Sequence, residues 1–339
     1  MKRYLRHFRV LIVLSAMTLL IFDPSTASTG ATAGMKICLE VIIPSLFPFF
    51  IISTYLNASL LGLSIPGIHA LGRLLHIPAG GEGILLVGLL GGYPVGAQAI
   101  AQAYQQGSID RRTASILLGY CNNAGPAFIF GIGSRIFSSF RIIMMLWVIH
   151  VFSALFTGML LPKPDADMKL RYCGIKPSIT RSLKDSVRIT AEICGWVIVF
   201  KVIILYVAKF IQLNTQSTAS ICLSGILELS NGCIQLTAIE FESIRFLLCS
   251  IFLAFGGICV MLQTVSVTAK LGIGFYIPGK IMQICFSIIL SALTVSIFFP
   301  DNQISPRKLT VLAVSAVTAL TLFSVFHKKC CGNSSVNHI

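Results

Sequence analysis

Charged side chains are scarce in this sequence of 339 residues. Only 11% of the residues are charged, whereas 55% are hydrophobic, and the mean hydropathy is +0.86. Soluble domains carry roughly 25% charged residues, so the composition excludes an ordinary soluble protein. Roughly twenty consecutive apolar residues cross a bilayer as a helix, and several such runs are present. The sequence therefore predicts an all-α, polytopic membrane protein whose surroundings are the lipid bilayer.

Motifs of soluble catalysis and of metal binding are also missing. The sequence has no P-loop, no Rossmann glycine fingerprint, no H-E-x-x-H and no G-x-S-x-G. Its six histidines lack metal-ligand spacing, and its eleven cysteines contain no C-x-x-C pair. Pumping driven directly by ATP would need another chain. We therefore expect no enzyme, no metal site and no cofactor, and we leave open a coupling ion, either sodium or a proton.

Acidic residues are few, since 12 Asp and Glu stand against 26 Lys and Arg, and the net charge is +14. The basic residues cluster in short segments between apolar runs, which is the positive-inside pattern of cytoplasmic loops rather than a sign of nucleic-acid binding. The strongest cluster lies in 162–189, and both termini are predicted to be cytoplasmic. A cleavable signal peptide and a signal-anchor helix both fit residues 1–34, and we favour the anchor. The expected location is a cell membrane, which the chain crosses several times.

Eight transmembrane helices are expected, at about 8–22, 35–56, 113–133, 140–161, 190–211, 244–268, 281–299 and 309–326. Two shorter apolar stretches, 83–106 and 220–239, are broken by glycine and have both flanks on one side of the membrane. They are predicted to be re-entrant hairpins, because a broken helix at membrane depth must lie within protein or line a cavity.

These elements predict two inverted repeats. The predicted divisions are an N-terminal helix and loop (1–34), a first repeat (35–161), a basic cytoplasmic linker (162–189), a second repeat (190–299), and a C-terminal helix with a basic tail (300–339). MKICLEVIIP aligns with VRITAEICGW at the start of the two repeats, which places Lys36 over Arg188 and Glu40 over Glu192. Both acidic residues are expected to form ordinary surface pairs at i, i+4 spacing.

Broken hydrophobic segments at corresponding places in two halves are the best sequence-level indication of a transporter's binding site. In the first half, GGYPVGAQ permits a tight reversal, and the asparagines of CNNAGP precede a helix-breaking proline. Half-helix N-termini there would direct N–H groups at an anion, although a satisfied helix kink is the competing interpretation. The candidate binding residues of this half are Gly92, Tyr93, Pro94, Gly96, Gln98, Asn122, Asn123 and Gly125.

In the second half, Glu228, Asn231 and Gly232 lie in the broken segment LELSNG, and Gln263 follows in the next helix. A carboxylate near the membrane midplane costs roughly 2.5 kcal/mol or more. Glu228 could therefore coordinate sodium, carry a coupling proton, receive a ligand donor, or be a protonated structural group.

Lysines complete the candidate set. Lys201 lies in the middle of an apolar helix and is expected either to attract a carboxylate substrate or to pair with Glu228. Lys270 and Lys280 are interpreted as markers of the cytoplasmic exit of the helix at 244–268.

Four segments carry a resemblance to a known family: IIPSLFPFF (42–50), GGYPVGAQ (91–98), CNNAGPAFIFG (121–131) and LELSNG (227–232). They resemble the sporulation integral membrane proteins of the nucleoside-recognition, or Gate-domain, family, which is similar to concentrative nucleoside transporters. The resemblance implies inverted repeats, hairpins and broken helices. It also implies a role in moving dipicolinic acid across the outer forespore membrane. The chain is short for that branch, which leaves room for a different substrate.

The expected function is secondary or facilitated transport of a small anionic solute by alternating access, with dipicolinic acid as the first candidate. The alternatives are a transporter of a nucleoside-like solute and a non-transporting scaffold for spore-envelope assembly. The expected partners are the solute and the bilayer, without nucleic acid. A homo-oligomer and assembly with other sporulation membrane proteins are both left open.

Overall fold

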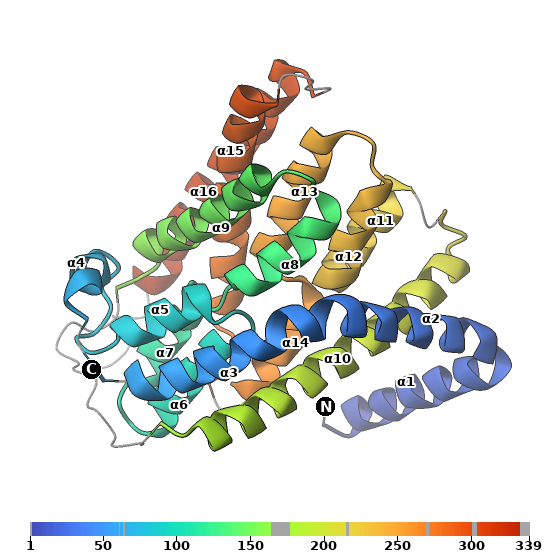
Figure 1. Ribbon diagram of the computed structural model, residues 1–339, viewed down its shortest axis with the longest axis horizontal. Helices are drawn as coiled ribbons and strands as arrows, with labels where there is room; N and C mark the ends of the chain where they lie inside the picture. Colours follow the sequence, from blue (N-terminus) through green and yellow to red (C-terminus); the bar gives the residue numbers. More distant parts are fainter. Residues whose placement is uncertain are drawn as a thin grey trace.

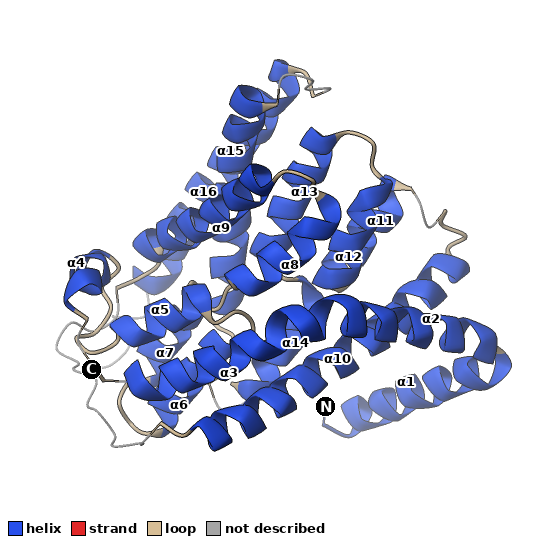
Figure 2. Ribbon diagram, in the orientation of Figure 1, coloured by secondary structure: helices blue, strands red, loops and turns tan. Residues whose placement is uncertain are grey.

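A computed structural model describes residues 2–60, 62–63, 65–163, 177–214, 217–268, 271–299 and 304–332. Regular structure in this part of the chain is helical throughout, and Figure 2 shows no strand there. The first half contains α1 (Lys2–Phe22), α2 (Pro24–Ile37), the π-helical turn η1 (Cys38–Ile42), α3 (Ile43–Leu60), α4 (Pro66–Leu74), α5 (Glu82–Leu90), α6 (Val95–Gln105), α7 (Arg111–Leu118), α8 (Pro126–Ile136) and α9 (Phe140–Leu160). The second half contains α10 (Ile179–Phe210), α11 (Thr218–Leu227), α12 (Leu229–Gln235), the short η2 (Leu236–Ala238), α13 (Glu242–Phe255), α14 (Gly257–Val267), α15 (Tyr276–Phe298) and α16 (Pro306–Gly332).

Five helical stretches among the described residues are long and apolar enough to cross a membrane: Pro24–Leu60, Phe140–Leu160, Ile179–Phe210, Glu242–Val267 and Tyr276–Phe298. The prediction of an all-helical, multi-pass membrane protein is therefore confirmed. The count of eight spans, the re-entry of two hairpins and the division into repeats remain predictions.

The two longest helical stretches pack against each other. Figure 1 shows α10 running along α2 and α3. Gly30 and Gly34 permit this approach, because a Cβ on either would lie 2.8 Å from a Cα of α10. The predicted surface pairs are confirmed, since Lys36 lies 3.9 Å from Glu40 and Arg188 lies 2.9 Å from Glu192. Helix α10 begins at Ile179, eleven residues before the expected start at 190.

Four pairs of short helices are separated by breaks, and three of the breaks fall in segments that the sequence predicts to be broken: 83–106, CNNAGP and LELSNG. Residues 91–94 separate α5 from α6, and residues 119–125 separate α7 from α8. Pro126 begins α8. Proline suits this position, because the first N–H of a helix has no partner within the helix. Glu228 is extended between α11 and α12. Gly256 ends α13 in the left-handed conformation that glycine adopts without strain.

Two of these pairs, α5–α6 and α11–α12, form helical hairpins whose helices meet at glycines. A Cβ on Gly96 would overlap the Cys121 carbonyl oxygen and lie 3.1 Å from the Cα of Gly88. In the second hairpin, a Cβ on Gly232 would overlap the Cα of Gly225. Both hairpins therefore depend on a glycine pair for their close packing.

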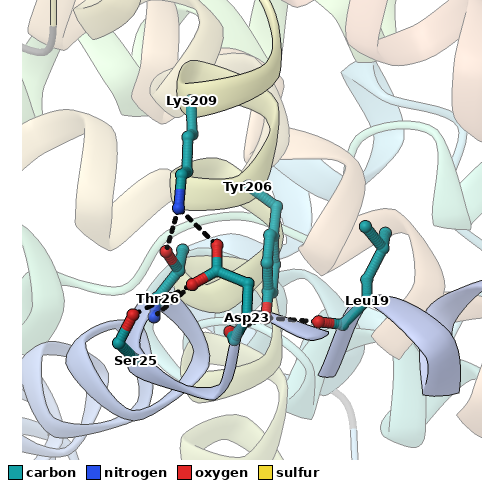
Figure 3. A network of polar contacts seen from close by, with 6 residues as sticks. All are labelled: Leu19, Asp23, Ser25, Thr26, Tyr206 and Lys209. Carbon is teal, nitrogen blue, oxygen red and sulfur yellow. Dashed lines mark hydrogen bonds and ion pairs between the residues drawn. The ribbon is translucent and has the colours of Figure 1, made fainter. Parts of the chain in front are cut away.

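A polar cluster fastens the α1–α2 corner to the end of α10 (Figure 3). The Lys209 ammonium group donates to the Asp23 carboxylate at 2.5 Å, and the Tyr206 hydroxyl donates to the Asp23 carbonyl oxygen at 2.6 Å. Asp23 also caps α2 by accepting from the Thr26 amide. The hydrogen bond from Lys209 is the largest cause that lowers the pKa of Asp23.

The remaining long helices form one side of the molecule. Helix α15 packs against α9, α13 and α16, as Figure 1 shows along the upper left edge. The middle is occupied by α8, α12 and α14. There α8 of the first half contacts α12, and α14 of the second half contacts α6. Each half thus sends a broken helix against the hairpin of the other.

Candidate functional site

A narrow cavity of about 30 Å³ lies where the helix breaks meet. Gly92, Tyr93 and Gly125 line it from the first half of the chain, and Glu228 and Gln263 line it from the second. The structure therefore brings together five of the predicted binding residues. The rest of the lining is mainly apolar and consists of Leu46, Ala124, Phe128, Ile193, Leu229, Ser230 and Val260.

Close backbone approaches hold the breaks around this cavity. A Cβ on Gly92 would lie 3.2 Å from the Gly125 amide nitrogen, and one on Gly257 would lie 3.2 Å from the Leu229 amide nitrogen. A Cβ on Gly256 would lie 3.2 Å from the Tyr93 hydroxyl. The last of these contacts joins the tip of the first hairpin to the break in the second half.

Glu228 is held by the N-terminus of its own helix, α12. Its carboxylate accepts from the Ser230 amide at 3.0 Å, the Asn231 amide at 2.7 Å and the Asn231 side chain at 2.8 Å. All three neighbours donate, which suits an ionised carboxylate, and anionic groups are stabilised at helix N-termini. The side chain is 2% exposed, so these donors replace its hydration.

Lys280 is the principal correction to the sequence analysis. Instead of marking a cytoplasmic exit, it lies one turn inside α15 and is 2% exposed. Its ammonium group donates to the Tyr93 hydroxyl at 2.9 Å and to the Asn122 carbonyl oxygen and Gln283 Oε1, each at 2.8 Å. The start of α15 packs so tightly on the α7–α8 break that a Cβ on Gly279 would overlap the Gly119 carbonyl oxygen.

A chain of amides fixes the orientation of Gln283 toward this lysine. Asn123 donates through Nδ2 to the carbonyl oxygens of Tyr120, at 2.6 Å, and Gly88, at 3.3 Å. Its Oδ1 therefore accepts from Gln283 Nε2 at 2.9 Å. Because the amide nitrogen of Gln283 is engaged there, its oxygen faces Lys280.

The predicted asparagines support the break and contact its neighbours. Asn122 Oδ1 accepts from the Ala97 amide at 3.3 Å, and its Nδ2 donates to the Thr264 hydroxyl at 3.0 Å. Buried His150 accepts through Nε2 from the Ala124 amide at 3.1 Å. These contacts tie the α7–α8 break to α6, α9 and α14.

The other predicted residues lie around the cavity rather than on it. Pro94 precedes α6, Gly96 and Gly232 pack the two hairpins, and Asn231 braces Glu228. Lys201 is half-buried on α10 and interacts electrostatically with Glu228. No ion pair joins Lys201 to Glu228 in the described structure.

Gln98 lines a second, polar pocket of about 100 Å³ between α3, α6 and α10. Arg181 and Asp185 of α10 line the same pocket. Along α3, Thr54 lines this pocket eight residues after Leu46 lines the central cavity, a separation of roughly 12 Å at 1.5 Å per residue. Helices α3 and α10 therefore contribute to the lining of both pockets.

Sequence reasoning missed Lys280, Gln283 and Thr264. The pattern Lys280-x-x-Gln283 places two polar side chains on one face of an apolar helix, and this was the available signal. Lys270, the other expected marker, lies outside the described residues, as do Lys169, Arg171 and Lys176 of the basic linker. In the described part of the chain, no group of three His, Cys, Asp or Glu side chains could hold a metal ion.

Comparison with known proteins gives one informative match. The chain is 33% identical over 119 residues to the sporulation integral membrane protein YlbJ of Bacillus subtilis strain 168. The match covers 33% of this chain and 28% of that protein. No protein-family model matches the chain, and no solved structure matches it. The similarity supports a relation to sporulation membrane proteins.

Proposed function

We propose that this protein transports a small solute across a membrane during endospore formation, with dipicolinic acid as the first candidate. The observation that carries the proposal is the central cavity, which broken helices of both halves line together. Binding sites at such helix breaks are typical of secondary transporters with repeated halves. The partial similarity to a sporulation membrane protein supports the biological setting.

Helix lengths favour re-entrant hairpins in this proposal. Helix α5 has nine residues and α11 has ten, so each rises only about 15 Å, half of a hydrocarbon core of about 30 Å. We infer that α5–α6 enters from the cytoplasm and that α11–α12 enters from the opposite side, in two inverted repeats. The two hairpin tips would then meet near the midplane, and alternating access would open one side at a time.

The cavity lining suits a flat solute with few polar groups. Leu46, Phe128 and Ile193 offer apolar contact, while the Gln263 amide offers hydrogen bonds. Lys280 donates to the hydroxyl of Tyr93, which lines the cavity, and so places a positive charge near the lining. That charge favours an anion such as dipicolinate.

Glu228 favours a second candidate, a nucleoside-like solute. Its carboxylate lines the cavity and could accept from a hydroxyl or a ring N–H, groups that dipicolinate dianion lacks. Uptake of labelled dipicolinate and of labelled uridine into vesicles that contain the purified protein decides between the two. A protein that is folded but moves neither solute would favour the scaffold function.

A matched pair of substitutions tests the cavity itself. Gln263→Leu removes a polar group from the lining, whereas Gln105→Leu changes an exposed residue at the end of α6. We expect the first to raise the KM of uptake about fivefold, since one net hydrogen bond is worth about 1 kcal/mol. The second should leave uptake unchanged. Equal uptake by both variants at matched membrane levels would place the solute elsewhere.

A further inference from the structure

The ammonium group of Lys280 is surrounded by oxygen atoms, as a bound metal cation would be. Three oxygens from different parts of the fold surround its ammonium group: a hydroxyl from the first hairpin, a carbonyl from the α7–α8 break, and an amide oxygen from α15. These acceptors match the three hydrogens of an ammonium group. The ammonium nitrogen also lies 5.0 Å from the ring centroid of Tyr93 and 5.7 Å from that of Tyr276.

A buried cation normally requires an anionic partner. Within the described structure, no ion pair joins Lys280 to a carboxylate. Neutral oxygens and aromatic faces take that place, and both stabilise cations without a counter-charge. Carbonyl oxygens released at helix breaks are also the groups that coordinate sodium in secondary transporters.

Contacts other than those with Lys280 orient two of these oxygens. The carbonyl of Asn122 is free because residues 119–125 are not helical. Gln283 presents its oxygen because Asn123 holds its amide nitrogen. Contacts independent of Lys280 therefore orient the Asn122 carbonyl and the Gln283 amide toward its position.

We propose that the Lys280 ammonium group is a tethered cation that occupies the cation position at the α7–α8 break in place of a free sodium ion. The inference rests on the proposed transport function for its mechanistic meaning. It removes sodium from the coupling ions that this position could bind. It also assigns Lys280 as the group that joins the first hairpin, the α7–α8 break and α15.

Thermal unfolding of the purified protein tests the proposal without transport. The wild-type Tm should be the same in sodium chloride and in choline chloride of equal concentration, because the position is already filled. Lys280→Ala leaves the three oxygens and the space of the lost chain. Its Tm should rise by several degrees in sodium chloride or n-propylammonium chloride relative to choline chloride.

Two variants serve as controls for a general salt effect. Lys280→Met fills the space without a charge, and Lys201→Ala removes a membrane lysine that lacks this set of oxygens. Neither should gain cation-specific stability. A sodium-specific rise in the wild-type Tm would overturn the proposal, as would a folded, monodisperse Lys280→Ala that is indifferent to both cations. The wild-type comparison needs no variant, so it remains decisive even where Lys280→Ala fails to fold.

Vesicle uptake adds an independent arm. Wild-type uptake should proceed at the same rate with an inward sodium gradient as with choline, and accumulation driven by sodium would contradict the proposal. Absence of uptake under every condition would instead count against the transport function, while the unfolding measurements would still decide the identity of the cation position.

Discussion

Glu228 and Lys280 are both 2% exposed, yet the fold stabilises them in different ways. Glu228 is held within its own helix, by the backbone two and three residues ahead and by the Asn231 side chain. Lys280 is held largely by partners 158 and 187 residues away in the sequence. The carboxylate thus depends on a local helix cap, whereas the ammonium group depends on the assembled fold.

This difference predicts different consequences of substitution. Loss of the Glu228 carboxylate removes the cap of one short helix, α12, whose N-terminal amides can still find other acceptors nearby. Losing the ammonium group leaves acceptors unpaired at the junction of α6, α7 and α15. Buried acceptors without a donor cost about 1–3 kcal/mol each. Substitution of Lys280 should therefore destabilise the protein more than substitution of Glu228.

The largest effect is therefore expected from Lys280→Met. We expect a loss of about 3 kcal/mol or more in stability, since the substitution leaves three buried acceptors without their donor, at about 1–3 kcal/mol each. The matched change Lys201→Met should cost much less, because Lys201 is half-buried and has no ion pair in the described structure. Thermal unfolding in detergent measures both. Equal losses would show that Lys280 is no more tightly integrated than Lys201.

The hairpin glycines allow the next comparison. Gly96→Ala and Gly232→Ala each place a methyl group on backbone of a neighbouring segment, and we expect each to cost about 1–3 kcal/mol through overpacking. Gly195→Ala is the control, because nothing lies within 4 Å of its Cβ position in α10. Gly195→Ala should leave the stability of the protein unchanged or raise it, since alanine has a higher helix propensity than glycine. A tolerated Gly232→Ala would mean that α11 and α12 can separate at low cost.

Glu228→Gln should have a smaller effect on stability, of about 1 kcal/mol. The glutamine oxygen can still accept from the α12 amides, but its NH₂ group faces donors where the carboxylate accepted. Thermal unfolding gives the cost, and vesicle uptake of uridine and dipicolinate gives the functional consequence. A nucleoside-specific loss of uptake would sharpen the substrate assignment, whereas a loss larger than that of Lys280→Met would reverse the comparison.

Local chemistry explains which features were predictable from the sequence. Gly-Pro and Gly-Gly signals act on the backbone where they occur, so the breaks near Gly92 and Gly125 were anticipated, and the second hairpin was expected to break within LELSNG, where Glu228 is extended in the structure. Lys280 was not, because its position depends on the tight packing of Gly279 against the α7–α8 break. Loop-charge counting assigns a lysine near a helix end to the aqueous side. Such counting takes no account of the oxygens that tertiary packing brings close to that helix end.

Gln98 shows a related limit. The residue follows the first hairpin break, and sequence alone cannot tell which side of α6 faces the central cavity. In the structure, Tyr93 lines the cavity while Gln98 lines the polar pocket beside Arg181. Tyr93 lies in the break before α6, whereas Gln98 lies in the first turn of α6, so neighbouring positions in a motif need not share a site.

The smallest effect is expected at the exposed edge of the molecule, for Asp23→Asn. The carboxylate pairs with Lys209 and caps α2 (Figure 3), and its pKa lies below the ordinary value. A lowered pKa means that the folded state favours the ionised form, so the pair contributes stability above the ordinary carboxyl pKa of about 4. That contribution is lost as the pH falls through the folded-state pKa.

The difference in Tm between wild type and Asp23→Asn should accordingly be constant near neutral pH and should shrink in acid. Glu192→Gln, which removes a partner of exposed Arg188 on the same helix as Lys209, controls for general surface charge. A difference that grows in acid would contradict the lowered pKa. A difference larger than that of Glu228→Gln would mean that the α1–α2 corner, and not the central cavity, holds α10 in place.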